Sequence, residues 1–415
     1  MTSSGPDTSI VILGASCRAA AQRAVRAGFQ PHAYDLFVDR DLIDCSKTGQ
    51  LDALHGSEEL WRNPHWNGTP MLLAGGMEHR PELVDRLRSH GLRCGVTGWM
   101  LKELRDFENW RSWAFCAGIG FPETRFSRPP EANHSSLPAE SQNVQWLRKR
   151  RKGAGGIGIV VESFSSTTES DEEPQHYWQR RLDGISIGVS FLSDAVRNHT
   201  LGSALSLTQE DVWGPEPYSY RGSISPIALP RVFAQQLDRF GDLVRRDVGH
   251  RGLWQADFIV SKDHLSLLEI NPRWSSSMEL LDALGQIAIP GRGVNEPKSS
   301  LVEWHVQSLG ESPISIHRDE GESDPQKTSC TIGKCIFYAQ RDQRIDEQLL
   351  ESWWRNRWHG SLQELDAGVR YADIPPAPSM MERGYPIVSC FASGNSCESI
   401  VNQFREAESN IFTPH

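Results

Sequence analysis

Leu265-Ser-Leu-Leu-Glu-Ile-Asn-Pro-Arg273 and the preceding Leu253-Trp-Gln-Ala-Asp-Phe-Ile-Val260 are the most informative segments of this sequence. Both runs have the apolar content and length of β-strands, and the polar Lys262-Asp263 between them is typical of a tight turn. This stretch therefore predicts an antiparallel hairpin that can carry acidic side chains on one face.

The acidic residues of this hairpin are spaced to meet. Asp257 and Glu269 stand twelve residues apart, and Asn271 returns to the Glu269 face because side chains alternate along a strand. Mg²⁺ favours few carboxylates combined with phosphate oxygens and water. The spacing predicts a Mg²⁺ or Mn²⁺ site at Asp257, Glu269 and Asn271, with a solvated acidic hairpin as the alternative.

A glycine-rich segment lies about a hundred residues earlier. It reads Lys149-Arg-Arg-Lys-Gly-Ala-Gly-Gly-Ile-Gly158, within a predicted hairpin spanning Trp146 to Phe164. Glycines let backbone N–H groups approach phosphate oxygens, and cations offset the phosphate charge. By itself the segment could be a flexible turn, but with the acidic hairpin downstream it predicts a polyphosphate site. The polar Ser163–Pro174 segment that follows is expected to be mobile and to close over that site.

Arg273 follows Pro272 at the end of the acidic strand and is expected to project toward the metal and phosphate region. A guanidinium there can hold a transferring phosphoryl group or a carboxylate, so we assign it a catalytic role. The alternative is a structural ion pair with Glu269 or Glu279.

Residues 9–97 alternate strand and helix patterns. The segments Ser9–Ser16, His32–Phe37 and Pro70–Gly76 are expected to be strands, and helices are expected at Cys17–Ala27 and from Pro81 to about Gly91. This order predicts a parallel α/β domain at the start of the chain.

Composition excludes several classes of protein. The 415 residues carry a net charge of −10, which argues against general binding to nucleic acid or to anionic membranes. The eight cysteines form no C-x-x-C pair, and the first residues have no apolar segment of signal-peptide length. We therefore expect a cytoplasmic protein that contacts neither nucleic acid nor membrane.

These parts, in this order, resemble the ATP-grasp superfamily over about residues 8–300. The chain looks like the group of predicted ATP-dependent carboligases, of the biotin-carboxylase-like and amino-acid-ligase type, and tyramine-glutamate ligase shares the plan. The resemblance implies an α/β plus α+β protein with an N-terminal domain at 1–98, an ATP-grasp domain at 99–300 (small lobe about 125–180, large lobe about 181–300), a linker at 301–328 and a C-terminal lobe at 329–415.

The resemblance also assigns nucleotide contacts. The family's lysine before the glycines falls on Lys149, with Lys152 as the rival. Adenine is expected at the hinge Gln179-Arg-Arg-Leu-Asp-Gly184, with backbone groups of Arg181 and Leu182 at its edge and Gln179 or Asp183 at the purine or ribose. The implied ATP contacts are Lys149, Lys152, Gly153, Ala154, Gly155, Gly156, Gln179, Arg181, Leu182 and Asp183.

The chain departs from the family at one nucleotide contact. Many members carry a lysine after an aspartate near the helix that precedes the Gly-x-x-x-Pro segment, whereas this chain reads Arg105-Asp106-Phe107. Arg105 and Lys102 are the candidates to replace it.

We therefore expect an ATP- and Mg²⁺-dependent ligase that joins a small-molecule carboxylate to an amine through an acylphosphate. Glutamate or another amino acid, and the tetrahydromethanopterin and methanofuran type of one-carbon cofactor biosynthesis, are what the resemblance suggests for substrate and pathway. The alternatives are a biotin-carboxylase-like subunit and a non-catalytic nucleotide-binding protein. The oligomeric state is open, with a homodimer as one option.

Overall fold

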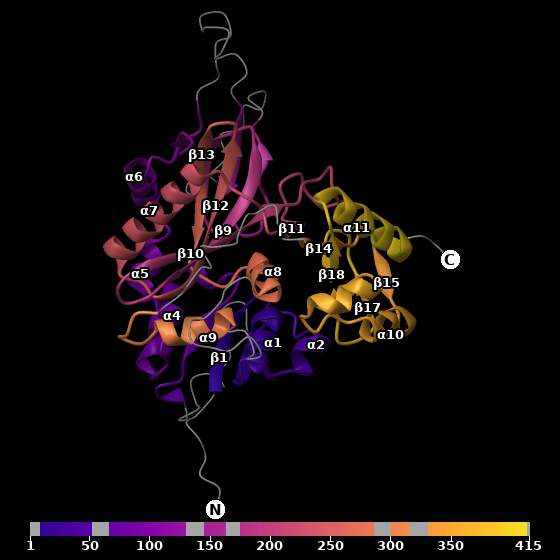
Figure 1. The fold of residues 1–415 in the computed structure, drawn as a ribbon. Helices are drawn as coiled ribbons and strands as arrows, with labels where there is room; N and C mark the ends of the chain where they lie inside the picture. Colours follow the sequence, from indigo (N-terminus) through magenta and orange to yellow (C-terminus); the bar gives the residue numbers. More distant parts are fainter. Residues whose placement is uncertain are drawn as a thin grey trace, which may run out of the picture.

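The computed structural model describes residues 9–51, 66–129, 145–162, 175–285, 300–314 and 331–412. Figure 1 shows the first strands and helices at the bottom of the molecule and the C-terminal helices at the right of a large sheet, which continues into the C-terminal strands. No helix in the described ranges has both the length and the apolar content needed to cross a membrane.

The N-terminal domain is built on a parallel sheet of order β3-β2-β1-β4. Its central strand is buried on both faces, which explains the unbroken apolar run Ile10–Leu13. The predicted parallel α/β domain is therefore confirmed. Its elements are β1 (Ser9–Gly14), α1 (Arg18–Arg26), β2 (Gln30–Asp35), α2 (Arg40–Ile43), β3 (Lys47–Gln50), β4 (Met71–Leu73), η2 (Met77–His79) and α4 (Pro81–Ser89).

Two helices, α5 (Gly98–Glu103) and α6 (Phe107–Ala117), lead to a small antiparallel sheet. The Asp106 carboxylate caps α6 by accepting hydrogen bonds from the backbone N–H groups of Glu108 and Asn109. The sheet has the order β5-β8-β6-β7. Its strands are β5 (Thr124–Arg125), β6 (Trp146–Arg150), β7 (Val160–Val161) and β8 (His176–Arg180). β6 and β7 form the predicted hairpin around the glycine-rich segment.

The large sheet is antiparallel and has the order β13-β12-β9-β10-β11-β14-β18-β16. Helix α7 (Arg231–Val248) covers one face with Phe233, Leu237, Phe240 and Val244, which recur at helical spacing. In Figure 1, α6 lies alongside α7 on that side. The strands are β9 (Ile185–Ser193), β10 (Asn198–Ser206), β11 (Gly222–Ser225), β12 (Gly252–Ser261), β13 (His264–Asn271), β14 (Thr331–Tyr338), β16 (Arg370–Ala372) and β18 (Pro386–Gly394).

The C-terminal residues extend this sheet, whereas we expected a lobe separated by a linker. β14 pairs with β11 over four residues, so backbone hydrogen bonds join the C-terminal strands to the large lobe. The remaining elements around this part of the sheet are α8 (Ser276–Leu284), β15 (Gln343–Ile345), α10 (Glu347–Arg355), η6 (Leu362–Ala367), β17 (Ser379–Met381) and α11 (Cys397–Phe412).

The expected linker at 301–328 also differs at its start. Residues 301–308 form helix α9 (Leu301–Ser308), and its Leu301, Val302 and Trp304 side chains are buried. They belong to the same apolar cluster as residues of β1 and α1. Residues 301–308 therefore form a helix packed on the N-terminal domain, although the sequence that follows them is polar. Residues 315–328 of the expected linker lie outside the described residues.

Buried charges connect the N-terminal domain to helix α8 and to the C-terminal strand β14. Arg18 of α1 donates to both carboxylate oxygens of Glu279 on α8, and Lys334 of β14 donates to Glu279 Oε2 over 3.0 Å. All three side chains are almost completely buried. Removing one partner would leave uncompensated buried charge, so this group fixes how the N-terminal domain meets the rest of the chain.

Candidate active site

The acidic hairpin forms as predicted. In the pairing of β12 with β13, Asp257 lies opposite Glu269 and Gln255 lies opposite Asn271, with a bulge after Asp257. Asn271 Nδ2 donates to Asp257 Oδ2 over 2.9 Å and to Glu269 Oε1 over 3.4 Å. The three predicted metal ligands therefore lie together on one face of the sheet.

The charges around Asp257 and Glu269 suit a divalent cation. Burial and the neighbouring Glu269 carboxylate raise the pKa of Asp257 to about 8. Burial opposes ionisation of Glu269, but Arg105 and Lys149 bring its pKa below the usual value. Among the described residues no Lys or Arg forms an ion pair with Asp257, so a cation between the two carboxylates would offset their repulsion.

Asn271 differs from the expectation in its orientation. Its amide nitrogen faces the carboxylates, while its Oδ1 accepts from Arg273 Nη2 over 3.4 Å. The amide must turn about its Cβ–Cγ bond before its oxygen can reach a cation at the carboxylates. The described ranges hold no cluster of three or more His, Cys, Asp or Glu suited to a metal ion, so this candidate site consists of two carboxylates and one amide.

Lys149 lies in this site, whereas its rival Lys152 is exposed. Lys149 Nζ donates to Gln179 Oε1 over 2.7 Å, across the pairing of β6 with β8. Burial lowers the pKa of Lys149, and the charges of Glu269 and Asp257 oppose that shift. The Gln179 amide also donates to Thr124 Oγ1, so its side chain holds Lys149 in place.

The glycine-rich loop is held on two sides. On the N-terminal domain, His79 Nε2 lies 3.2 Å from the carbonyl oxygen of Gly153. On the large lobe, the backbone N–H of Tyr220 donates to the Gly155 carbonyl over 2.7 Å, and the Gly158 N–H donates to the Glu216 carboxylate. Gly155, Gly156 and Gly158 have φ of +61°, +72° and +77°, which only glycine adopts readily.

Arg273 forms neither of the two ion pairs considered from the sequence. Its Nε donates to Glu78 Oε1 over 2.8 Å, and Glu78 comes from η2 of the N-terminal domain. Glu279 is instead bonded to Arg18 and Lys334. Burial opposes ionisation of Glu78, but Arg273 lowers the pKa of this carboxyl group, and the pair remains charged.

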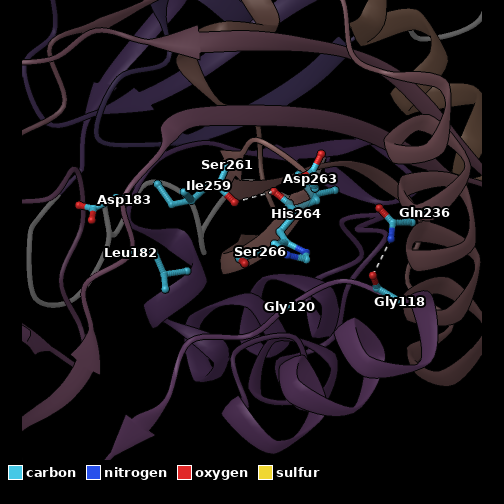
Figure 2. A pocket seen from close by; sticks show the side chains of 11 residues that line it. Gly118, Gly120, Leu182, Asp183, Gln236, Ile259, Ser261, Asp263, His264 and Ser266 are labelled. Atoms are coloured by element: carbon cyan, nitrogen blue, oxygen red, sulfur yellow. Dashed lines mark hydrogen bonds between the residues drawn. The ribbon is translucent and has the colours of Figure 1, made fainter. Parts of the chain in front are cut away.

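A cavity of about 260 Å³ lies beside the hinge. Leu182 and Asp183 line it from the hinge side, with the tip of the β12–β13 hairpin and the Gly118–Gly120 segment opposite (Figure 2). Ile259 and Ser266 in its wall lie on the two strands that carry Asp257 and Glu269. The cavity is therefore adjacent to the carboxylates along the same strands.

The hinge residues were expected to contact adenine and ribose, and only some of their groups are placed to do so. The Arg181 N–H donates to the Gln145 carbonyl over 2.8 Å, which leaves the Arg181 carbonyl as its remaining group for a base edge. Leu182 and Asp183 lie at the cavity, whereas the Gln179 side chain is turned to Lys149.

Four residues at this site were not identified from the sequence as site residues: Glu78, His79, Glu216 and Tyr220. Glu78 and His79 follow the Gly75-Gly76 turn after β4, and the carboxyl end of a parallel strand is where α/β domains bind ligands. That position was a usable signal. Glu216 and Tyr220 lie in an irregular segment whose sequence has no comparable signal.

Comparison with known proteins identifies one domain of the chain and its fold. Residues 121–277 match the family model of the ATP-grasp domain. The chain therefore carries an ATP-grasp domain, and its structure has the ATP-grasp fold.

Three solved structures illustrate the likeness in fold. They are N5-carboxyaminoimidazole ribonucleotide synthetase from Thermotoga maritima (12% identity, TM-score 0.59, 97% of this chain and 98% of that chain), L-amino acid ligase from Bacillus licheniformis (13%, 0.58, 98% and 98%) and the biotin carboxylase–β,γ-ATP complex from Campylobacter jejuni (12%, 0.60, 96% and 90%). No curated protein sequence matches the chain. At these identities the likeness establishes the fold, and it covers the C-terminal strands as well.

Proposed function

We propose that this protein is an ATP- and Mg²⁺-dependent ligase that joins a carboxylate to an amine through an acylphosphate. One observation carries the proposal: Lys149 and the carboxylates of Asp257 and Glu269 converge from two sheets, beside a cavity at the hinge. Phosphoryl transfer depends mainly on such positioned charges, and it requires no protein nucleophile.

Each group has a role that its contacts support. Asp257 and Glu269, with Asn271 once its amide has turned, would hold Mg²⁺, which would supply charge neutralisation to the phosphates. Lys149, fixed by Gln179, would contact the nucleotide phosphates, and the N–H groups of the glycine loop would face the same polyphosphate. The base would lie at Leu182 and Asp183.

The reaction follows from these placements. A substrate carboxylate oxygen attacks the γ-phosphorus of ATP, the bond to the β-phosphate oxygen breaks, and ADP leaves. Arg273, held by Glu78, stabilises charge on the transferring phosphoryl group. An amine then attacks the acyl carbon, loses a proton and displaces phosphate. The segment Ser163–Pro174, expected to cover the site, lies outside the described residues.

Amide formation is preferred to carboxylation for a reason in the sequence. The 415 residues contain no Met-Lys-Met segment of the kind that carries biotin, so a biotin-dependent carboxylase would need a carrier outside this sequence. The likeness to an L-amino acid ligase covers 98% of both chains and is compatible with an amino acid as one substrate. A glutamate or similar substrate, and a role in one-carbon cofactor synthesis, are the finer form of this proposal.

The test is release of phosphate from Mg-ATP in the presence of amino acids, amines and pterin- or furan-type precursors, with products followed by mass. Acceptor-dependent ADP formation with the mass of an amide supports the proposal. Bicarbonate-dependent phosphate release would favour the carboxylase. Nucleotide binding without turnover on any acceptor would indicate the non-catalytic alternative.

A further inference from the structure

Gln255 holds one oxygen of the candidate metal ligand Asp257. Gln255 Nε2 donates to Asp257 Oδ1 over 2.7 Å, while Asp257 Oδ2 accepts from Asn271 Nδ2 over 2.9 Å. Gln255 and Asp257 are two positions apart on strand β12, so their side chains share a face of the sheet. Once the Asn271 amide has turned, Gln255 would keep Oδ1 and leave Oδ2 free for a cation.

Two serine hydroxyls fix the Gln255 amide in this orientation. Ser275 Oγ and Ser277 Oγ both donate to Gln255 Oε1, the latter over 2.5 Å. The three side chains are buried, with at most 9% exposed, so water has little access to compete for these hydrogen bonds. An amide whose oxygen is held by two donors presents its nitrogen on the other side, which is where Asp257 lies.

Gly188 of the neighbouring strand leaves room for this arrangement. It lies opposite Asp257 in the pairing of β9 with β12. A Cβ at position 188 would lie 2.7 Å from Gln255 Nε2 and 3.3 Å from Asp257 Oδ1, inside normal nonbonded contact. The hydrogen bond between Gln255 and Asp257 therefore fills the space that a side chain on β9 would otherwise occupy.

A neutral donor suits a metal ligand in this position. A lysine or arginine paired with Asp257 would neutralise the carboxylate, whereas an amide N–H orients it and leaves its negative charge for the metal ion. The hydrogen bond also compensates for the loss of water at a buried carboxylate oxygen. Removal of a residue that orients a metal ligand typically lowers metal affinity or activity by about 10- to 100-fold.

The two serines lie at the start of a helix that other parts of the chain hold in place. Ser275 is the N-cap of α8, and Ser277 lies in its first turn. Glu279 of the same helix is paired with Arg18 of the N-terminal domain and with Lys334 of β14. The position of the serine hydroxyls therefore depends on contacts of α8 with both the N-terminal domain and the C-terminal strands.

We propose that Gln255 is a positioning residue which, together with Ser275 and Ser277, sets the orientation in which Asp257 meets the metal ion. The inference rests on the proposed function and deepens it, because it names residues that prepare the metal site without binding the metal themselves. Its consequence is a loss of metal affinity when the Gln255 amide, or a hydroxyl that holds it, is removed.

Electron paramagnetic resonance of Mn²⁺, added to the full chain with and without ADP, measures metal binding independently of turnover. Gln255→Met keeps the length of the side chain but has no N–H donor, so it is expected to weaken Mn²⁺ binding by about tenfold or more. Ser277→Ala should cause a smaller loss, because Ser275 still holds the amide. In the Gln255→Met background, Ser277→Ala should cause no further loss, since its effect on the metal passes through the amide. Gln307→Met, at an exposed position of α9, is the matched control and should bind Mn²⁺ as wild type does.

Adenosine affinity and melting temperature show whether these substitutions disturb the fold. In Gln255→Met, adenosine affinity should change by less than about twofold, because adenosine has no phosphates to share with the metal. An equal loss of Mn²⁺ and adenosine affinity would indicate a general structural role and contradict the proposal. Unchanged Mn²⁺ affinity in Gln255→Met would overturn it directly, and so would a full additional loss from Ser277→Ala in the Gln255→Met background. A wild-type protein that binds Mn²⁺ neither alone nor with ADP would instead overturn the metal site of the proposed function, and this inference with it.

Discussion

Glu78 and Arg273 form a buried ion pair between two parts of the chain that are 195 residues apart in sequence. Arg273 Nε donates to Glu78 Oε1 over 2.8 Å, and the Glu78 side chain is 2% exposed. Arg273 also donates to Asn271, so the pair links the N-terminal domain to a candidate metal ligand. The position of the proposed catalytic arginine therefore depends on how the N-terminal domain docks.

This link predicts that Glu78→Gln impairs both stability and turnover. Breaking a buried pair on one side typically costs about 3–5 kcal/mol, because the remaining charge is left uncompensated. Denaturant unfolding measures the stability loss, and phosphate release at saturating ATP measures turnover. In a double-mutant cycle, Glu78→Gln with Arg273→Gln should lose less stability than the sum of the single variants. Strict additivity would show that the two side chains do not act together.

Glu269→Gln is predicted to abolish ADP formation while the fold remains intact. The amide keeps the size of the side chain but removes the charge that faces Asp257 and would hold Mg²⁺. Phosphate release measured across a range of Mg²⁺ concentrations tests this, with circular dichroism to monitor the fold. Glu406→Gln, on the exposed side of helix α11, is the matched control and should behave as wild type. Wild-type turnover in Glu269→Gln would contradict the metal assignment.

The glycine loop should loosen when Glu216 loses its charge. The Glu216 carboxylate accepts from the Gly158 N–H, and Tyr220 of the same segment bonds Gly155. In Glu216→Gln the acceptor is weaker, so amide hydrogen exchange of the 153–158 peptide is expected to accelerate several-fold. Glu210→Gln, an exposed neighbour in sequence, is the control. Equal exchange in all three proteins would mean that Glu216 does not hold the loop.

His250 is predicted to make the fold sensitive to acid. Burial, and the charge of Arg245, lower the pKa of His250 to about 3, while in the unfolded chain it should be about 6.5. Between these values the unfolded state binds the extra proton, so stability falls as pH decreases below about 6.5. The slope contributed by one such group approaches about 1.4 kcal/mol per pH unit.

The His250→Leu variant isolates this contribution. His250 is buried against Trp254 and lies near Ser193, away from the candidate site. Whatever the variant's stability at pH 7, its free energy of unfolding should decline less steeply than that of wild type between pH 6.5 and 4. Parallel curves for the two proteins would show that His250 does not titrate on unfolding.

The local parts of the site could be predicted from the amino-acid sequence. From the sequence, Asp257, Glu269 and Asn271 belong to one antiparallel hairpin, and Asn271 shares the face of Glu269 by strand alternation. The bulge after Asp257, which sets Glu269 opposite Asp257 in place of Leu268, appears only in the structure. The glycine-rich hairpin and the parallel N-terminal sheet are equally local, since each follows from periodicity and turn residues within a few tens of residues. These features also carried the resemblance to the ATP-grasp superfamily.

The distant groups that complete the site could be identified only from the three-dimensional structure. Glu78 reaches Arg273, Arg105 reaches Ile270, and Glu216 reaches Gly158, from elements whose sequences carry no mark of their partners. The pairing of β11 with β14, which joins the C-terminal strands to the large lobe, is of the same kind. An apolar pattern specifies that a face is buried but not what covers it, because burial free energy is non-directional. The partner of a long-range ion pair or strand is fixed by the packing of the whole chain.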